Sequence, residues 1–515
     1  MTARSSESST ESSTESSTGS STESSTGSST GSPAGNRTEG SSEASSGKER
    51  PGPRRRLSDE LAENMKRGWA DTERHDIRTL PQAAHTARRR AALSARFPGE
   101  RLVVPAGNLK VRANDTHYPF RPSSEYVHLT GDQTEDGVLV LEPGAEGGHR
   151  ATIHLLPRSD RENGEFWLTP RGELWDGRRN SLAENERLLG LPARDVRTLA
   201  AALGEATGPV RVLRGHDAGI EEALRDKVTA EADEELRVFL SEARRVKDDF
   251  EIAELRHACA ATARGFEDVV RVLDRAEATS ERYIEGTFFL RARVEGNDVG
   301  YGTIAAAGRH ATTLHWVRND GEVRPGDLLL LDAGVETRTL YTADVTRTLP
   351  VSGTFTPLQR TIYDAVYEAQ EAGIAAVKPG AVFRDFHDAA QRVLAGKLVE
   401  WGLLEGPVER VLELGLQRRW TLHGTGHMLG LDVHDCDRAR AEAYVDGTLE
   451  AGVVLTVEPG LYFQADDLTV PEEYRGIGVR IEDDLLVTED GNENLSAALP
   501  RRSDEVEAWM ARLKG

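Results

Sequence analysis

Three apolar segments in the C-terminal half of this chain each carry a carboxylate where a buried strand usually has none. The segments run from 328 to 332, from 453 to 458 and from 479 to 487, and their acids are Asp332, Glu458 and Glu482. Any one of these acids taken alone is most simply a surface or capping residue. Three acid-bearing apolar strands together predict strands that converge on a bound cation, because an ionised carboxylate is costly to bury without one.

A fourth acid, Asp344, lies in the segment that follows Asp332. Turn residues over 336–342 would return the chain as a second strand and bring the two carboxylates together, where they would repel each other unless a cation neutralised them. An additional residue inside a strand would instead flip the register and turn Asp344 away. The sequence therefore predicts a strand, a turn and a returning strand that place both acids on one face.

Three histidines, His423, His427 and His434, lie within twelve residues of one another. His423 and His427 have the spacing of a zinc-binding helix, but Gly424 replaces the glutamate that this motif requires, and Gly426 weakens a helix. The sequence therefore disfavours a single-zinc enzyme of that type. We expect one of the three imidazoles to bind metal and the others to donate hydrogen bonds or to carry protons.

The pattern as a whole indicates a pair of divalent cations. Four carboxylates and one imidazole are a ligand set with which two such ions can share a bridging water, and this predicts a two-metal hydrolase. The candidate ligands are Asp332, Asp344, His427, Glu458 and Glu482. The two-residue period of a strand places Arg480 on the same face as Glu482, so that Arg480 can orient this carboxylate.

Composition limits the possible partners and compartments. The chain has 64 Lys and Arg against 86 Asp and Glu, and its net charge of −22 argues against nucleic acid as a partner. Its two cysteines, Cys259 and Cys436, exclude a disulfide framework and favour a reducing cytoplasm, and we expect Cys436 to be a small buried hydrophobe. No apolar run approaches the roughly 20 residues that span a bilayer, and no signal-peptide hydrophobic region is found, so we expect a cytoplasmic protein with no membrane partner.

The chain divides by composition into three regions. Residues 1–56 are a Ser/Thr-rich tail and basic linker that we expect to be disordered. In residues 57–240 short β-rich runs alternate with helical stretches, which predicts a smaller α/β domain. Residues 241–515 mix blocks of long helices with strands and predict an α+β domain. We expect one amphipathic helix, from about 231 to 273, to connect the two domains.

The motifs of the C-terminal half resemble those of the pita-bread metallopeptidases, and most closely those of the aminopeptidase P family. The resemblance runs from about 103 to 495. It rests, in family order, on Asp332-Ala-Gly, Asp344-Val-Thr-Arg-Thr, His423-Gly-Thr-Gly-His427, Leu431-Asp-Val-His434-Asp, Val457-Glu458-Pro-Gly-Leu-Tyr462 and Gly478-Val-Arg480-Ile-Glu482-Asp. It implies an α+β fold with a C-terminal pita-bread catalytic domain behind a smaller, creatinase-like α/β N-terminal domain, which matches less specifically.

The resemblance also implies a role for individual residues. Asp332 would bind one metal ion, Asp344 and Glu482 would bridge both ions, and His427 and Glu458 would complete the ligands of the second. The catalytic residues it implies are His434, Glu458, His423 and Arg480. The substrate-binding residues it implies are His315, Tyr301, His423 and His434. In the N-terminal half, Glu125 and Trp175 are candidates for contacting the amino end of the substrate.

The activity implied is hydrolysis of the N-terminal Xaa-Pro bond of peptides by a hydroxide shared between two divalent ions, most often Mn²⁺ in this family. The partners implied are peptides with proline at the second position and further copies of the chain, in a dimer or tetramer. Three alternatives stay open: a prolidase, which takes dipeptides; a creatinase-type enzyme, which lacks metal ligands; and a non-catalytic peptide-binding module. The segment Tyr118-Pro-Phe-Arg favours aminopeptidase P over prolidase, and the complete ligand set disfavours the other two.

Overall fold

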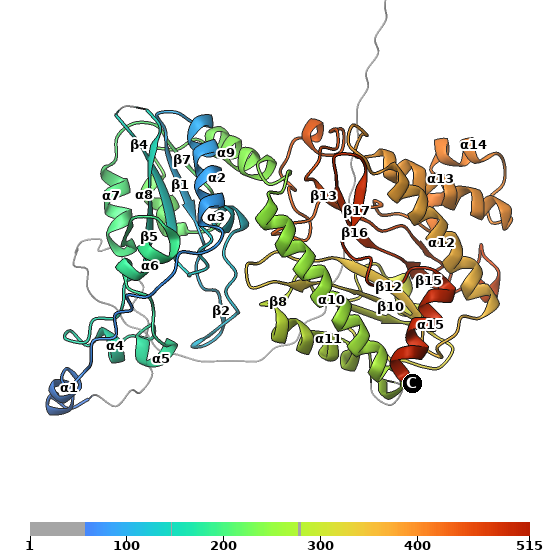
Figure 1. Cartoon of the computed structure of the whole chain (residues 1–515), viewed down its shortest axis with the longest axis horizontal. Coiled ribbons are helices and arrows are strands. Elements are labelled where there is room, and N and C mark those ends of the chain that lie inside the picture. The colour runs from blue at the N-terminus through green and yellow to red at the C-terminus, as the bar shows by residue number, and fades with distance from the viewer. Residues whose placement is uncertain (1–56, 146, 277–279) are drawn as a thin grey trace, which may run out of the picture. The chain divides into compact units, whose positions relative to one another are not determined.

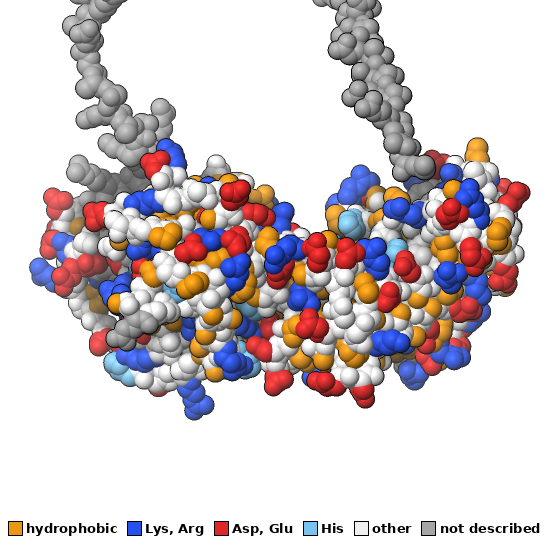
Figure 2. Space-filling model, turned by 90° about the horizontal axis from the view of Figure 1, so that it is seen from above, with side chains coloured by type: hydrophobic (Ala, Val, Ile, Leu, Met, Phe, Trp, Pro, Cys, Tyr) orange, Lys and Arg blue, Asp and Glu red, His pale blue; other side chains and the backbone are white. Residues whose placement is uncertain are grey.

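The computed structural model describes residues 57–145, 147–276 and 280–515 (Figure 1). The tail that the sequence predicts to be disordered, residues 1–56, lies outside the described residues. Residues 63–515 form one compact unit. Within the part of the chain that the structure describes, no helix is both long and apolar enough to cross a membrane. On the face visible in Figure 2, acidic and basic side chains are interspersed rather than gathered into patches of one sign.

The N-terminal part of this unit is built on a five-stranded mixed sheet. Its strands are β1 (Arg101–Pro105), β4 (Val138–Pro143), β5 (His149–Leu155), β6 (Ala193–Asp195) and β7 (Val210–Val212), in the order β6-β5-β4-β1-β7. The β1·β7 and β5·β6 pairs are parallel, and the β1·β4 and β4·β5 pairs are antiparallel. A short hairpin, β2 (Val111–Ala113) and β3 (Thr116–His117), lies outside this sheet.

Helices cover both faces of this sheet because its strands alternate between two apolar cores. Leu102 and Leu139 pack in one core with Leu93 of a helix, whereas Val103 and Val140 pack in the other. The helices of this part are α2 (Ala83–Arg96), α3 (Ser124–Thr130), α4 (Glu165–Leu168), α5 (Glu173–Asp176), α6 (Leu182–Leu189), α7 (Leu199–Glu205), α8 (Ala218–Leu224) and α9 (Ala230–Glu242). A further short helix, α1 (Asp59–Met65), begins before the first residue of this compact unit. The arrangement confirms the α/β architecture that the sequence predicts for this part.

The sequence predicts one connecting helix over about 231–273, and this prediction is wrong because the segment forms two helices. Helix α9 ends at Glu242, and α10 (Asp249–Ala276) begins after a short break. Inside the break Lys247 is fully buried, with its Nζ 2.9 Å from Asp435 Oδ2 and its backbone N–H bonded to Gly452. The chain therefore leaves the helix to make tertiary contacts, which the unbroken helical pattern of the sequence does not reveal.

The C-terminal part has long helices outside several short sheets (Figure 1). After α10 its helices are α11 (Glu281–Glu295), α12 (Pro357–Ala376), α13 (Asp385–Glu400), α14 (Val408–Leu414) and α15 (Ser503–Lys514). Helix α12 begins with Pro357 at its first turn and a capping box in which the Thr356 and Gln359 side chains bond each other's backbone N–H. Both long helices predicted for 358–377 and 382–398 are confirmed, with bounds shifted by a few residues.

The strands of the C-terminal part form several small antiparallel sheets. They are β8 (Asp298–Val299), β9 (Ile304–Ala307), β10 (Leu328–Ala333), β11 (Val335–Glu336), β12 (Val345–Pro350), β13 (Val454–Val457), β14 (Gly460–Tyr462), β15 (Gly478–Arg480), β16 (Asp483–Val487) and β17 (Asn492–Asn494). The sheets have the orders β12-β10-β9, β11-β8, β13-β16-β17 and β14-β15. The predicted strand over 479–487 is interrupted, because β15 pairs with β14 and β16 with β13. The mixture of helix blocks and antiparallel strands confirms the predicted α+β class.

The strands of this part present one apolar and one polar face. In β10 Leu329 and Leu331 join the main apolar core, together with residues of the covering helices. In β15 and just beyond it Val479 and Ile481 do the same. Because successive strand residues point to opposite faces, Asp332, which follows Leu331, and Arg480, which lies between Val479 and Ile481, face the other way, toward the cavity described next.

Candidate metal centre

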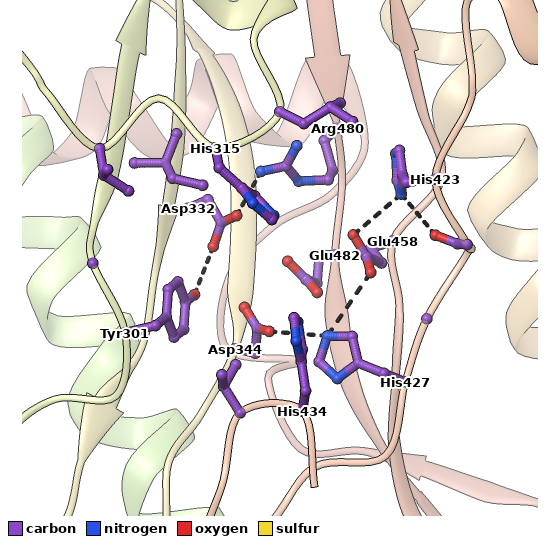
Figure 3. A pocket seen from close by; sticks show the side chains of 17 residues that line it. Tyr301, His315, Asp332, Asp344, His423, His427, His434, Glu458, Arg480 and Glu482 are labelled. Carbon is purple, nitrogen blue, oxygen red and sulfur yellow. Dashed lines mark hydrogen bonds and ion pairs between the residues drawn. The ribbon is translucent and has the colours of Figure 1, made fainter. Parts of the chain in front are cut away.

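A cavity of about 610 Å³ lies among the strands of the C-terminal part, and the ten site residues that the sequence predicts in this part are all among the 17 that line it (Figure 3). They are Tyr301, His315, Asp332, Asp344, His423, His427, His434, Glu458, Arg480 and Glu482. The other lining residues are Gly302, Ile304, Leu314, Val317, Gly424, Gly426 and Val433. The fold thus brings the predicted side chains together from strands and loops that lie far apart in the chain.

Strand register places Asp332 and Asp344 on one face. Asp332 of β10 pairs with Thr346 of β12, so their side chains point the same way, and Asp344 lies two residues before Thr346. The chain turns between Glu336 and Thr342, which form a bridge. The predicted strand, turn and returning strand are confirmed.

Gly334 allows the two acid-bearing segments to approach each other. A Cβ added at this glycine would lie 1.7 Å from the carbonyl oxygen of Ala343, the residue before Asp344. Any side chain at position 334 would therefore push apart the segments that carry Asp332 and Asp344. Glycine is therefore required at the third position of the Asp332-Ala-Gly motif for a steric reason, since only glycine lets the two acids come close.

Arg480 and Thr346 hold two of the carboxylates in place. The Arg480 guanidinium donates to Asp332 Oδ2 at 2.5 Å, to Tyr462 Oη at 3.0 Å and to Thr346 Oγ1 at 3.1 Å. Thr346 in turn donates its hydroxyl hydrogen to Glu482 Oε2 at 2.7 Å. Arg480 thus orients Asp332 directly and Glu482 through Thr346, which refines the expectation that it orients the carboxylate two residues ahead.

His427 and Glu458 reach the cavity from two neighbouring segments. The Glu458 backbone N–H donates to Thr425 O at 2.7 Å, and the His427 backbone N–H donates to Thr456 Oγ1 at 3.2 Å. These bonds join the 425–427 loop to the end of β13, so the loop follows a strand and is not a helix. His427 Nε2 lies 3.3 Å from Asp344 Oδ2 and 3.8 Å from Glu458 Oε1.

The crowding of acids changes the affinity of these groups for protons. Burial raises the pKa of Glu458 to about 7, with Asp344 and Asp332 adding to the rise and His427 opposing it. Burial also raises the pKa of Glu482 well above its usual value, and the charge of Asp344 raises it further. Burial alone would lower the pKa of His427, but the hydrogen bond and charge of Asp344 outweigh it and raise this pKa to about 9. The site is short of positive charge.

The remaining histidines have different environments. His423 Nε2 lies 2.8 Å from Tyr462 Oη, and burial together with the charge of Arg480 lowers the pKa of His423 to about 4. The ring of His434 lies edge-on to that of His427, with centroids 4.3 Å apart, and burial lowers the pKa of His434 as well. Both side chains are therefore neutral near pH 7 and can donate or accept a hydrogen bond in the cavity.

Tyr301 and His315 lie on the side of the cavity nearer β9. Tyr301 donates its hydroxyl hydrogen to Asp332 Oδ1 at 2.6 Å (Figure 3). His315 follows a short helical turn over Gly308–Thr312 and lies between the apolar lining residues Leu314 and Val317. The cavity thus has an acidic floor and a partly apolar wall.

Sequence reasoning missed Thr346 and Tyr462 as residues that hold the site, although both lie inside motifs that it quoted. Their signal was available: Thr346 is two residues after Asp344, and Tyr462 is two residues after Gly460 in a strand, which places each on a predictable face. The four apolar lining residues, Ile304, Leu314, Val317 and Val433, carry no such signal. Thr346 and Tyr462 could have been found from strand periodicity alone.

The two candidates of the N-terminal part do not line the cavity. Glu125 lies 3.0 Å from Arg244 in an ion pair, and Trp175 is 62% exposed with its Nε1–H donated to Trp167 O. Cys436 has no exposed surface and packs among Val453 and other apolar side chains, and burial raises its pKa to about 12. The expectation that Cys436 is a buried hydrophobe is confirmed.

Comparisons with known proteins agree with this arrangement. The chain matches the model of metallopeptidase family M24 over residues 253–489 and that of the aminopeptidase P N-terminal domain over residues 86–211. It is 80% identical over 459 residues to Xaa-Pro aminopeptidase 1 of Streptomyces coelicolor, covering 89% of this chain and 93% of the relative. It is 34% identical over 438 residues to Xaa-Pro aminopeptidase of Escherichia coli, covering 82% and 96%. The solved structure of Pseudomonas aeruginosa aminopeptidase PepP is similar with a TM-score of 0.74 at 32% identity, covering 85% of this chain and 100% of that one.

Proposed function

The chain belongs to metallopeptidase family M24 and is a metal-dependent peptidase, and we propose that it removes the first residue of peptides whose second residue is proline. The observation that carries this proposal is the cavity that all five candidate ligands line together with His423 and His434. The relatives that are 80% and 34% identical are named Xaa-Pro aminopeptidases, and the N-terminal match is to the aminopeptidase P domain. Both support an aminopeptidase over a prolidase.

The donor set fits divalent metal. Single ligand atoms of Asp344, His427 and Glu482 all lie within 4.8 Å of one another, close enough to share an ion. Carboxylate oxygens and one imidazole suit Mn²⁺ and similar ions. We propose two ions, Mn²⁺ by preference, with Asp332 on one, Asp344 and Glu482 on both, and His427 and Glu458 on the second. The buried acids with raised pKa are the groups that such cations would neutralise.

When bound, the two ions supply an activated water and an electrophile for the peptide carbonyl. The chain's own residues supply the rest of the proposed mechanism. Neutral His434 donates a hydrogen bond to the carbonyl oxygen as charge develops on it, which stabilises the tetrahedral state. Glu458, at the edge of the cavity's acid cluster, would take the proton of the attacking water and pass it to the leaving proline nitrogen. Arg480 orients Asp332, and its charge opposes the rise that burial causes in the pKa of this carboxyl.

Selection of proline rests on shape in this proposal. A proline nitrogen in a peptide bond has no hydrogen to donate, so no acceptor of the cavity can recognise it. The apolar wall and the rings of His423 and His434 would surround the compact proline ring, while His315 and Tyr301 would contact the rest of the peptide.

Three further points belong to the same proposal. We propose that residues 57–240 form the N-terminal domain and residues 241–515 the catalytic domain, in an assembly of two or four copies. We also propose a cytoplasmic location, which is supported by two cysteines that are both free and buried.

The test is hydrolysis of a matched peptide panel by the full chain after chelation and again after addition of Mn²⁺. We expect metal-dependent release of the first residue from Xaa-Pro-Yaa tripeptides and none from Xaa-Ala-Yaa controls. Cleavage confined to Xaa-Pro dipeptides would mean a prolidase instead. No cleavage of any peptide with Mn²⁺, Co²⁺ or Zn²⁺ would contradict the catalytic proposal and favour a peptide-binding protein.

A further inference from the structure

Glu281, the first residue of α11, is a buried carboxylate with four hydrogen-bond donors. Its Oε1 accepts from the backbone N–H of Ala307 at 2.7 Å and from His310 Nδ1 at 2.8 Å. Its Oε2 accepts from Trp316 Nε1 and from the backbone N–H of Gly321, both at 2.8 Å. The side chain has no exposed surface. A carboxylate whose two oxygens each accept two hydrogen bonds is fixed in position.

All four donors belong to one segment, residues 307–321. Ala307 is the last residue of β9 and Gly321 lies at the far end of the segment, so Glu281 bonds both ends and two side chains between them. The Glu281 backbone N–H also donates to Gly321 O at 3.0 Å. The two ends of the segment are therefore held close together by hydrogen bonds to the Glu281 side chain.

The same segment carries part of the cavity wall, and it is also anchored by hydrogen bonds of Thr312 to Gln464 and of Asn319 to Thr303 and Ala305. Leu314, His315 and Val317 line the cavity, and Trp316, which lies among them, points its indole N–H to Glu281. The Trp316 ring is stacked on that of His310, with centroids 3.9 Å apart and planes inclined by 24°. Because Trp316 donates a hydrogen bond to Glu281 and stacks on His310, the neighbouring His315 has a fixed position in the cavity lining.

Gly321 shows how closely this arrangement is packed. A Cβ added at Gly321 would lie 2.5 Å from the His310 ring and 2.8 Å from Glu281 Oε2. Only glycine allows the backbone N–H to reach the carboxylate at this point. The contacts with Glu281 and His310 therefore require glycine at position 321.

We propose that Glu281 is a positioning residue for substrate: by binding residues 307–321 at four points, it fixes His315, Leu314 and Val317 against the peptide in the cavity. The inference rests on the proposed function and adds to it a residue that touches neither metal nor substrate. Glu281 acts through Trp316 and His310. Loss of a bond to this carboxylate lets the wall of the cavity move while the carboxylates of the metal centre stay in place.

The first test variant is Trp316→Phe, which removes one donor to Glu281 and keeps an aromatic ring for stacking on His310. Without this donor the cavity wall beside His315 is held less firmly, and we expect kcat/KM for Xaa-Pro-Yaa peptides to fall by roughly tenfold. Glu281→Gln, in which the amide group can no longer accept from two of the donors, should cause a larger loss. Bound Mn²⁺ per chain should stay at the wild-type level in both variants.

The decisive measurement is a double-mutant cycle with His315→Ala. If Trp316 acts by placing His315, the loss caused by Trp316→Phe should largely disappear in the His315→Ala background. Tyr126→Phe is the matched control, because it removes another buried aromatic donor to a buried carboxylate, Tyr126 Oη to Asp132 Oδ2 at 2.7 Å, far along the chain. This control should lower the melting temperature and leave kcat/KM unchanged.

The outcomes separate this proposal from the proposed function. A wild-type enzyme that is inactive on Xaa-Pro peptides contradicts the function itself. An active wild type with kcat/KM within twofold in Trp316→Phe and Glu281→Gln overturns the positioning role. If the kcat/KM losses of Trp316→Phe and His315→Ala multiply, the two residues act independently, and this also overturns the positioning role. An equal loss of kcat/KM in Tyr126→Phe overturns it too, since the losses would then reflect stability alone.

Discussion

Thr346 donates its hydroxyl hydrogen to Glu482 across the gap between two strands, at 2.7 Å, and neither side chain is exposed to solvent by more than 1%. Thr346 Oγ1 also accepts a hydrogen bond from Arg480 Nε at 3.1 Å. Thr346 therefore relays the position of the guanidinium to a carboxylate that we propose binds both metal ions.

Thr346→Val keeps the shape of this side chain and removes its hydroxyl group. We expect Mn²⁺ affinity to fall by roughly 10-fold and kcat/KM to fall with it, because loss of a bond behind a ligand typically costs 10–100-fold. Titration of chelated protein with Mn²⁺ measures the first, and peptide hydrolysis the second. Thr130→Val is the control, at another buried threonine whose hydroxyl donates to the Tyr126 carbonyl oxygen and accepts from the Asp132 backbone N–H, and it should leave both unchanged. Unaltered metal affinity in Thr346→Val would show that the relay has no role.

Gly334→Ala tests the close approach of the two acid-bearing segments. The added Cβ would lie 1.7 Å from Ala343 O, so Asp332 and Asp344 must separate. We expect a loss of at least about 100-fold in activity, together with loss of bound metal, because misplacement by about 1 Å is enough for such a change. Gly204→Ala, at a helical glycine where an added Cβ meets nothing within 4 Å, is the control. Activity near the wild-type level in Gly334→Ala would mean that the segments can shift without harm.

Asp435→Asn tests the buried charges behind the loop that carries His434. Asp435 lies 2.8 Å from Arg244 Nε and 2.9 Å from Lys247 Nζ, and all three side chains are at most 2% exposed. The variant leaves two buried cations short of a counter-charge, so we expect a loss of about 3–5 kcal/mol in the free energy of unfolding. Thermal unfolding measures it. Glu450→Gln, which breaks the exposed pair with Arg245, should cost less than about 1 kcal/mol. Similar melting temperatures for the two variants would contradict the prediction.

The pH dependence of stability has a contribution from Glu184 in the N-terminal part. Burial alone would raise its pKa, but hydrogen bonds from Arg178 and from the Arg74 and Ser181 amides outweigh this and lower the pKa from 4.5 to about 2. A lowered pKa in the folded state means that the ionised form stabilises the protein above pH 4.5, and that this stabilisation is lost as the pH falls from 4.5 toward 2.

Glu184→Gln keeps the capping geometry and removes the charge. Because Arg178 is 29% exposed, solvent screens part of the interaction, and we expect a loss of about 1 kcal/mol at pH 7. The difference in melting temperature between wild type and variant should shrink steadily between pH 5 and pH 2.5. A difference that is the same at both ends of this range would exclude a contribution from the charge.

The sequence predicted the polar face of the site well because strand periodicity and motif order carry it. Asp332, Asp344 and Glu482 each directly follow a buried apolar residue, so the direction of each acid follows from the two-residue period of a strand. The α/β and α+β classes likewise follow from the order of apolar runs and helical stretches. These features are local, and a single sequence contains them.

Other features depend on contacts that no local pattern contains. The break between α9 and α10 follows from the burial of Lys247 against Asp435, which is 188 residues away. The role of Glu281 was invisible for the same reason, since an acidic residue in the first turn of a helix is the ordinary preference there. Only the three-dimensional structure shows that four donors of a distant segment meet at this carboxylate.

The five proposed metal ligands are spread from Asp332 to Glu482, so 482 − 332 = 150 positions of the chain separate the first from the last. During synthesis Asp332 and Asp344 leave the ribosome long before Glu482 and Arg480 exist. Until then, the strand pair β10·β12 has two adjacent acids, no guanidinium beside them and no complete set of ligands for a cation. The nascent catalytic domain must therefore remain incomplete and dependent on late residues, and any premature stop before Glu482 yields a chain that cannot assemble its metal site.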